Sequence, residues 1–330
     1  MTMPKTPALD FTTPLDASTL KDKSILVTGG ASGIGQACVE AYASYGAFVT
    51  IADLQEEAGT QIVKDLTSKG YKVNFVQCDV TDYDSQFKAF KSAIGFGGGR
   101  LDVLLPCAGI IAQRNLFDMA ASSIPSLDAP PPAPGLSGID VNLKGSYYSC
   151  FLALHYFRLP EPEDAPMFRK AIVLVASTAA YVGYPFSSTY SISKFGIRGL
   201  FHGIREKALA QSPRVRVNLV APWYIKTAMT TSDKDPMIAA FLAGLGFASM
   251  EDVVDTILRM SADEKVLGRA AIVVPEGKWD LGDNIWEGYG GKVTQERIGE
   301  RMSTVLPKLM EARRMKDEHE AKMEAEGAAK

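Results

Sequence analysis

Short apolar runs alternate with amphipathic stretches along most of this chain, and the alternation predicts its secondary structure. The runs are rich in Val, Ile and Leu, which favours strands. The predicted strands are residues 24–28, 48–52, 73–76, 101–105, 172–175, 215–220 and 271–274. The stretches between them, such as 36–43 and 56–68, have helical patterns. Strands separated by helices need right-handed crossovers, so we expect an α/β fold with a parallel sheet of about seven strands covered on both faces.

The predicted elements define one main domain with additions at both ends. At 330 residues the chain is long for one domain and short for two. Residues 21–276 are expected to form the main domain, preceded by a polar leader, residues 1–20, that packs loosely. Residues 277–330 are a C-terminal extension whose mixed-charge end favours a helix. That helix is either solvated or a contact between subunits.

One long loop interrupts the alternation between the fourth strand and the next helix. Residues 122–138 contain the run Ala129-Pro130-Pro131-Pro132-Ala133-Pro134-Gly135, which cannot lie inside a helix. The loop is either a surface excursion or a wall of a site mouth, because ligand sites in such folds lie at the carboxyl ends of strands.

Composition narrows the class of protein. Hydrophobic residues make up 46% of the chain and the net charge is −3, which favours a large core and gives no basic patch for nucleic acid. The four cysteines are scattered without disulfide or metal-ligand spacing, so we expect reduced core residues and no metal site. The sequence has no signal-peptide pattern and no apolar run long enough for a membrane span. A cytoplasmic location is the expectation.

A glycine-rich turn follows the first predicted strand and opens a helix. In the run Thr28-Gly29-Gly30-Ala31-Ser32-Gly33-Ile34-Gly35 the glycines allow a sharp turn and a close approach of a pyrophosphate. The helix N-terminus then offers unpaired N–H groups to the phosphates. Without this context the glycines would indicate only an ordinary turn.

An acidic residue ends the second strand and bears on cofactor choice. The carboxylate of Asp53 can accept hydrogen bonds from ribose hydroxyls and would repel a 2′-phosphate. Leu54 and Gln55, which follow, carry no positive charge. These residues predict NAD over NADP, and an N-cap role for Asp53 is compatible with that.

The ends of the third and fourth strands add candidate contacts to the same ligand. Asp79 could bond an adenine amino group and leave Val80 against the ring, although Asp79 alone would more often be a turn or cap residue. The small residues Ala108 and Gly109 let a cofactor lie close to the backbone.

Three polar side chains form a candidate catalytic group. Lys194 lies one helical turn beyond Tyr190, so the two side chains share a helix face. A neighbouring ammonium lowers the pKa of a phenol, which can then exchange a proton with an alcohol or carbonyl near neutral pH. Ser177 ends the fifth strand and can orient the substrate oxygen. Asn142, inside a predicted helix, could divert a backbone carbonyl toward a proton-relaying water.

These residues together resemble the short-chain dehydrogenase/reductase family. The motifs that carry the resemblance are Thr28-Gly29-x-x-x-Gly33-x-Gly35, Asp79-Val80, Ala108-Gly109, Asn142, Ser177 and Tyr190-x-x-x-Lys194. The resemblance implies a Rossmann fold, an Asn142-Ser177-Tyr190-Lys194 tetrad, and homodimers or homotetramers built on the helices holding Asn142 and Tyr190. Within the family the chain looks most like NAD-dependent secondary-alcohol dehydrogenases of the 15-hydroxyprostaglandin dehydrogenase type and of fungal secondary metabolism.

Two positions depart from the family pattern. Cys107 stands where the family usually has an Asn that ties strands together, so we expect a local rearrangement without loss of chemistry. Trp223 replaces the Gly of the Pro-Gly motif after the sixth strand, and it either roofs the substrate pocket or packs outward.

The candidate cofactor contacts are Gly29, Ser32, Gly33, Ile34, Gly35, Asp53, Leu54, Asp79, Val80, Ala108, Gly109, Tyr190, Lys194, Pro222, Ile225 and Thr227.

The substrate site is expected on loops beside the nicotinamide. Apolar and aromatic residues cluster after strand ends there, and although such residues often belong to a core, they suggest a broad hydrophobic pocket. The segment 223–250 is expected to include a mobile lid. The candidate pocket residues are Ile110, Thr178, Tyr184, Phe186, Trp223, Tyr224, Met229 and Phe241.

The function predicted from these residues is NAD-dependent interconversion of a hydrophobic secondary alcohol and its ketone. No Arg cluster marks a phosphorylated substrate. Two alternatives stay open: a family member recruited for non-redox catalysis with the cofactor as scaffold, and a cofactor-sensing binding module.

Overall fold

The computed structural model describes residues 6–161, 168–184, 186–210, 215–231 and 246–282, together with residue 318. The chain divides into two compact units, Met1–Gly282 and Asp283–Lys330. The first unit holds the sheet and every site residue discussed below.

The first unit is built on one sheet in the order β3-β2-β1-β4-β5-β6-β7-β8. All neighbouring pairs are parallel except β7 and β8, which are antiparallel. The order reverses at β1, which lies between β2 and β4, and this is where ligands bind in open α/β sheets. The strands are β1 (Ser24–Thr28), β2 (Phe48–Asp53), β3 (Lys72–Gln77), β4 (Val103–Pro106), β5 (Ala171–Val175), β6 (Arg216–Pro222), β7 (Ala270–Val274) and β8 (Gly277–Asp280).

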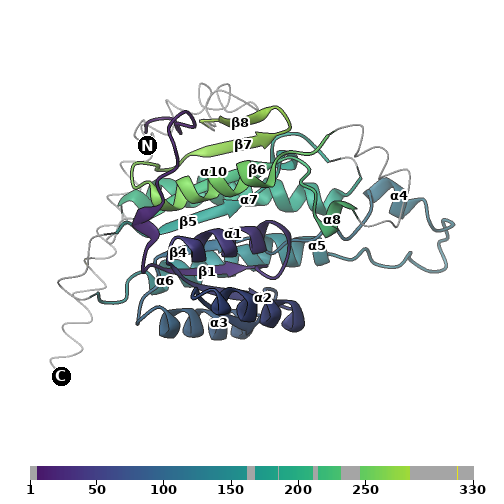
Figure 1. Cartoon of the computed structure of the whole chain (residues 1–330). Coiled ribbons are helices and arrows are strands. Elements are labelled where there is room, and N and C mark those ends of the chain that lie inside the picture. The colour runs from purple at the N-terminus through teal and green to yellow at the C-terminus, as the bar shows by residue number, and fades with distance from the viewer. Residues whose placement is uncertain are drawn as a thin grey trace. The chain divides into compact units, whose positions relative to one another are not determined.

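Helices cover both faces of this sheet, which confirms the predicted Rossmann-type α/β fold (Figure 1). The longer ones are α1 (Gly33–Ser44), α2 (Glu56–Ser68), α3 (Tyr83–Phe96), α6 (Ser146–Tyr156), α7 (Ser188–Ala210) and α10 (Met250–Ala262). Apolar residues of α1, α2 and α10 share one core cluster, and those of α3, α6 and α7 share the other. In β1 the side chains alternate between them, since Ile25 and Val27 join the first cluster and Leu26 joins the second.

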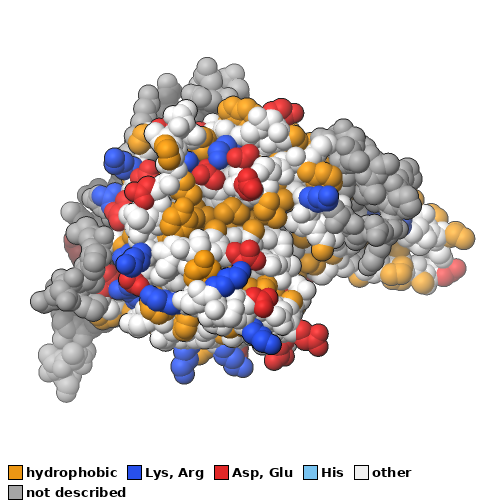
Figure 2. Space-filling view, in the orientation of Figure 1, with side chains coloured by type: hydrophobic (Ala, Val, Ile, Leu, Met, Phe, Trp, Pro, Cys, Tyr) orange, Lys and Arg blue, Asp and Glu red, His pale blue; other side chains and the backbone are white. Residues whose placement is uncertain are grey.

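The short helical pieces lie in the connections, mostly near the carboxyl edge of the sheet. They are η1 (Ser18–Leu20), α4 (Leu116–Ala120), α5 (Ser137–Ile139), η2 (Asp140–Gly145), η3 (Thr178–Ala180) and α8 (Ala228–Thr231). The loop containing α4 projects from the rest of the unit (Figure 1), and Figure 2 shows hydrophobic side chains at its surface. Phe117 and Ile124 are among the exposed apolar side chains of this loop.

The eighth strand was not among the seven predicted from the apolar runs. Its sequence, Gly277-Lys278-Trp279-Asp280, contains no apolar run and pairs with β7 through a tight turn. Gly277 has a φ of +138°, which a residue with a side chain rarely adopts. The sheet therefore extends past residue 276, where the sequence placed the end of the main domain.

The leader does not pack loosely as the sequence suggested, at least from residue 6 onward. Leu9, Ala17 and Leu20 are buried in the core cluster beneath α1 and α10. The backbone N–H of Leu9 also donates to the Asp280 carboxylate at 2.8 Å. The Arg259 guanidinium adds hydrogen bonds to the Asp10 and Thr13 carbonyls, at 3.1 and 2.7 Å.

Candidate active site

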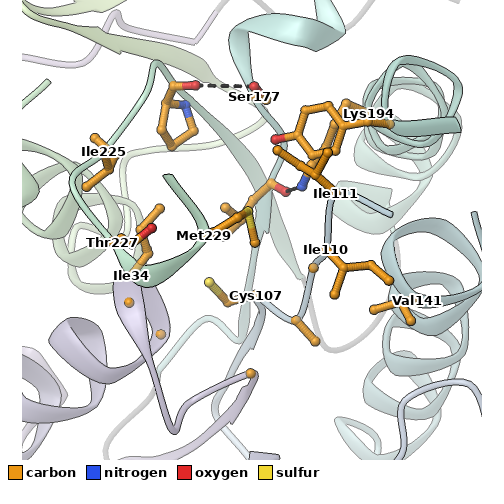
Figure 3. A pocket seen from close by; sticks show the side chains of 18 of the residues that line it. Ile34, Cys107, Ile110, Ile111, Val141, Ser177, Lys194, Ile225, Thr227 and Met229 are labelled. Atoms are coloured by element: carbon orange, nitrogen blue, oxygen red, sulfur yellow. Dashed lines mark hydrogen bonds between the residues drawn. The ribbon is translucent and has the colours of Figure 1, made fainter. Parts of the chain in front are cut away.

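A cavity of about 720 Å³ opens at the carboxyl ends of the parallel strands, around the point where the strand order reverses. Figure 3 shows Ile34, Ile225 and Thr227 on one side of it and Lys194, Ile110 and Val141 on the other. The structure brings the candidate site residues together here, with two exceptions. Asn142 lies behind the cavity wall, and Phe241 lies outside the described residues.

The glycine turn forms one wall, and its geometry explains why glycine is needed. Gly29 has a φ of +69°, and a Cβ there would come within 2.6 Å of the Ala108 Cα. A Cβ on Gly35 would come within 2.1 Å of the Gly29 carbonyl oxygen. The turn therefore packs α1 directly against the backbone of the β1 and β4 ends, and the α1 N-terminus faces the cavity.

The N-terminus of α1 is free to receive an anion. Ser32 is its N-cap residue, is exposed, and makes no capping hydrogen bond with its side chain. The first N–H groups of the helix and the Ser32 hydroxyl thus remain for a phosphate group. Unpaired backbone donors at a glycine turn fit the pyrophosphate of a dinucleotide.

Asp53 lies at the end of β2 with its carboxylate fixed by backbone donors. Its two oxygens accept from the N–H groups of Ala31 and Gln55, each at 3.0 Å. The side chain is buried. Among the described residues lining the cavity the one Lys or Arg is Lys194, so no cation stands beside Asp53.

Asp79 and Val80 lie at the end of β3 on the same wall. One Asp79 oxygen accepts from the N–H and the hydroxyl of Thr81, each at 2.8 Å, which is the turn role considered from the sequence. Val80 packs against Gly145, where a Cβ would come within 2.9 Å of a Val80 methyl carbon.

Ser177 and Tyr190 lie together at the end of β5 and the start of α7. The Ser177 hydroxyl donates toward the Pro222 carbonyl at 3.4 Å (Figure 3) and accepts from the Ala179 N–H at 3.2 Å. Tyr190 is half-buried, and desolvation raises the pKa of its phenol to about 12, although the Ser177 side chain opposes this shift. The phenol is therefore protonated at neutral pH.

Lys194 is buried one turn further along α7. Its Nζ atom lies 5.6 Å from the centre of the Tyr190 ring and donates to the Val175 carbonyl at 3.0 Å. Desolvation lowers the pKa of Lys194 to about 8. The net pKa shift of Tyr190 is upward, opposite to the lowering that the sequence predicted, because burial disfavours the charged form of the phenol.

This burial predicts a pH-dependent stability. The ordinary pKa of the side chain is 10.5, so between about pH 8 and 10.5 the unfolded chain holds a proton that the folded chain has lost, and folding becomes more favourable as pH rises. Lys194→Met should remove this cost and stabilise the chain at pH 7 by up to about 3 kcal/mol. The gain should shrink through that window in thermal-unfolding measurements. Lys91→Met, at an exposed lysine, should show no such trend. A stability difference between Lys194→Met and wild type that stays the same at all pH values would contradict a lowered pKa at Lys194.

Asn142 holds the wall of the cavity and does not line it. It lies in η2, a π-helical turn, with its side-chain oxygen accepting from the Ile110 N–H at 2.8 Å. Its side-chain nitrogen donates to the Ile110 carbonyl and to the Ser193 hydroxyl, each at 3.0 Å. The Asn142 backbone carbonyl, expected to be diverted toward a water, accepts from the Ser146 hydroxyl at 2.7 Å. The side chain thus ties the β4 loop to α7.

Cys107 and Trp223, the two positions that depart from the family pattern, both line the cavity. β4 pairs with β5 only through Val103 and Leu104, so these strands separate before Cys107, where the sequence led us to expect a rearrangement. Desolvation raises the pKa of the Cys107 thiol to about 11, so it stays neutral. Trp223 lines the cavity, and its indole N–H donates to the Gly246 carbonyl at 3.2 Å.

Some lining residues were not singled out from the sequence. Ile111 and Val182 belong to the loops 110–115 and 178–186, where the substrate site was expected, whereas Val141 was not anticipated and only its closeness to Asn142 could have indicated it. None of residues 122–138 lines the cavity, which favours a surface excursion for the proline-rich loop. Of the predicted lid, Met229 lines the cavity, whereas residues 232–245 lie outside the described part of the chain.

The part of the chain that the structure describes contains no group of three or more His, Cys, Asp or Glu side chains placed to hold a metal ion. It also contains no helix with the length and apolar character that a membrane crossing requires.

Comparison with known proteins gives consistent matches. A family model described as short chain dehydrogenase matches residues 23–237. The 5'-hydroxyaverantin dehydrogenase of Dothistroma septosporum is 42% identical over 286 residues, which make up 84% of this chain and 93% of that protein. The NADP-dependent dehydrogenase M3 of Phoma sp. is 32% identical over 301 residues, or 87% of each chain. The crystal structure of gox2181 superposes with a TM-score of 0.62 at 29% identity, over 78% of this chain and 95% of that one.

Proposed function

Because the chain belongs to the short-chain dehydrogenase family, whose members are oxidoreductases that use a nicotinamide cofactor, we propose that it interconverts a hydrophobic secondary alcohol and its ketone with NAD. The observation that carries this proposal is the grouping of Ser177, Tyr190 and Lys194 beside the glycine turn in one cavity.

Each residue of the group has a role that follows from its surroundings. Ser177 holds the substrate oxygen, and Tyr190 takes the hydroxyl proton during oxidation or returns it during reduction. Lys194 lies near enough to Tyr190 to stabilise its anion, and Asn142 acts as a positioning residue through Ile110 and Ser193. A bound nicotinamide supplies the acceptor or donor of the hydride.

NAD is the proposed cofactor because Asp53 is held at the end of β2, where a ribose diol would bind, and because Lys194, the one Lys or Arg among the described lining residues, belongs to the catalytic group and not to the Asp53 end. The Phoma relative is named as NADP-dependent, so this choice needs its own test. Asp53→Ser combined with Leu54→Arg should shift the ratio of kcat/KM values for the two cofactors toward NADP by about 100-fold or more, since one negative charge is removed and one positive charge is added beside the phosphate.

The matched control for that double variant is Leu54→Gln, which alters the same exposed position without charge and should keep the NAD preference. A wild-type chain that prefers NADP would refute the cofactor assignment while leaving the reaction type intact.

The proposed substrate is an apolar alcohol or ketone, because most lining side chains on the substrate side are apolar or aromatic. The Dothistroma relative is named for a hydroxylated compound, and the chain resembles fungal secondary-metabolite dehydrogenases. A panel of hydrophobic secondary alcohols and ketones with both cofactors, followed by the absorbance of the reduced nicotinamide, tests the reaction.

The same panel separates the two alternatives. Non-redox catalysis would convert substrate with no change in nicotinamide absorbance, and a sensing module would bind NAD in a thermal-shift titration without turnover of any alcohol. Neither has a specific observation in its favour.

We also propose a cytoplasmic homodimer or homotetramer formed by α6 and α7. Tyr147 and Phe151 on α6, and Ile192 and Phe195 on α7, are large apolar side chains exposed in the single chain. Light scattering that finds a monomer at micromolar concentration would refute this assembly.

A further inference from the structure

A row of aromatic rings crosses the roof of the cavity and ends on the catalytic tyrosine. The Tyr184 ring centre lies 5.3 Å from that of Tyr190 at an interplanar angle of 65°, and 6.4 Å from that of Tyr224 at 57°. Tyr224 in turn meets Trp223 edge-on at 5.0 Å. All four line the same cavity, although Tyr184 follows β5 and Tyr224 follows β6. The row therefore joins two loops directly above the reacting group.

Hydrogen bonds to the backbone hold the row in place. The Ser191 hydroxyl accepts from the Tyr184 N–H at 2.9 Å and donates to its carbonyl at 3.0 Å, and Ser191 directly follows Tyr190 on α7. The Tyr224 carbonyl accepts from the Ala248 N–H at 2.9 Å. Tyr184 and Tyr224 are thus anchored independently, and each is fixed relative to the catalytic phenol.

Tyr184 and Tyr224 bring two phenol hydroxyls to the lining of the cavity. Desolvation is the largest cause of the pKa shift at both residues and raises the pKa of each, so both phenols stay neutral. A neutral phenol can both donate and accept a hydrogen bond. The pair can therefore offer a donor and an acceptor to a ligand.

Ile111, Val182, Phe186 and Met229 add apolar side chains to the same lining, which also includes Thr178. An apolar pocket alone would accept aliphatic and aromatic alcohols of similar size. Ring edges and faces next to a neutral donor and acceptor instead match a flat aromatic ring that carries its own hydroxyl.

We propose that Tyr184 and Tyr224 determine specificity by selecting secondary alcohols whose carbinol carbon is attached to a hydroxylated aromatic ring. This inference rests on the proposed function for the reaction. It concerns the ratio of kcat/KM values between two substrates and not the rate with any single substrate.

The test uses three carbinols with the same reacting group: hydroxyphenyl methyl carbinol in its meta form, phenyl methyl carbinol and cyclohexyl methyl carbinol. For the wild type, kcat/KM should fall in that order, by about fivefold or more at each step, as expected for one buried hydrogen bond and one aromatic contact. Tyr184→Phe and Tyr224→Phe should abolish the difference in kcat/KM between the hydroxyphenyl and phenyl carbinols and keep the difference between the phenyl and cyclohexyl carbinols. Tyr224→Leu should abolish both differences.

Tyr45→Phe, at an exposed tyrosine at the far end of α1, is the control and should leave both ratios unchanged. Wild-type ratios in all the Tyr184 and Tyr224 variants would overturn the proposal. If no carbinol is turned over with either cofactor, the proposed function fails. The specificity is then tested by the dissociation constants of the three matching ketones, measured by calorimetry. The affinities should fall in the same order as above, and the Tyr184 and Tyr224 variants should lose the same differences.

Discussion

Tyr190→Phe is expected to lower kcat by about 10³-fold or more while the dissociation constant for NAD stays within a few-fold of wild type. The substitution removes the one hydroxyl that can exchange a proton with the substrate oxygen, and general acid–base catalysis is typically worth about 10²- to 10⁴-fold. It keeps the ring, so the 5.3 Å contact with Tyr184 survives and the wall of the cavity is not opened.

The measurement is single-substrate kinetics beside a calorimetric titration with NAD. Tyr45→Phe removes an exposed hydroxyl from the same residue type and should leave both quantities unchanged. Turnover near the wild-type rate in Tyr190→Phe would end the proposed role. If the variant loses both NAD binding and turnover, the hydroxyl stabilises the cofactor site and not the transition state.

Gly29→Ala should weaken NAD binding by about 100-fold or more and lower the free energy of unfolding by several kcal/mol. The φ of +69° at Gly29 costs about 1–2 kcal/mol for a residue with a Cβ. The new Cβ would also lie 2.6 Å from the Ala108 Cα, which is backbone and cannot move without shifting the end of β4. The turn must therefore open where the pyrophosphate is expected to lie.

Gly70→Ala is the matched control because it separates the two costs. Gly70 has a φ of +83°, yet a Cβ there meets no atom within 4 Å. We expect a loss of about 1–2 kcal/mol in urea unfolding and an unchanged NAD dissociation constant. Equal effects of the two substitutions on NAD binding would mean that the close approach to Ala108 has no part in forming the site.

The secondary structure could be predicted largely because local pattern and fold agree. The predicted first strand, 24–28, has the bounds of β1, and the predicted helix 56–68 has the bounds of α2. Both combine strong periodicity with clear flanking turns. β8 was missed because its strand character comes from pairing with β7 and from the turn at Gly277, neither of which leaves an apolar run.

The candidate site was predictable to a similar extent. The glycine turn, Asp53 and the Ser177-Tyr190-Lys194 group could be placed together because the carboxyl ends of parallel strands meet at one edge. The side chains that complete the wall, such as Val182, belong to loops whose path has no periodic signal. Their place in the cavity depends on contacts with distant segments.

The chemistry of this chain can be read from short motifs, because the spacing of the reacting groups and the glycines sets their place on a strand end or a helix face. The ionisation of those groups, in contrast, depends on how the folded chain packs around them. Burial raises the pKa of Tyr190 and lowers that of Lys194, and burial is a property of the packed cavity and not of any segment. The tertiary structure likewise decided that Asn142 stands behind the cavity wall and that Tyr184 and Tyr224 meet, since each contact joins residues far apart in the chain.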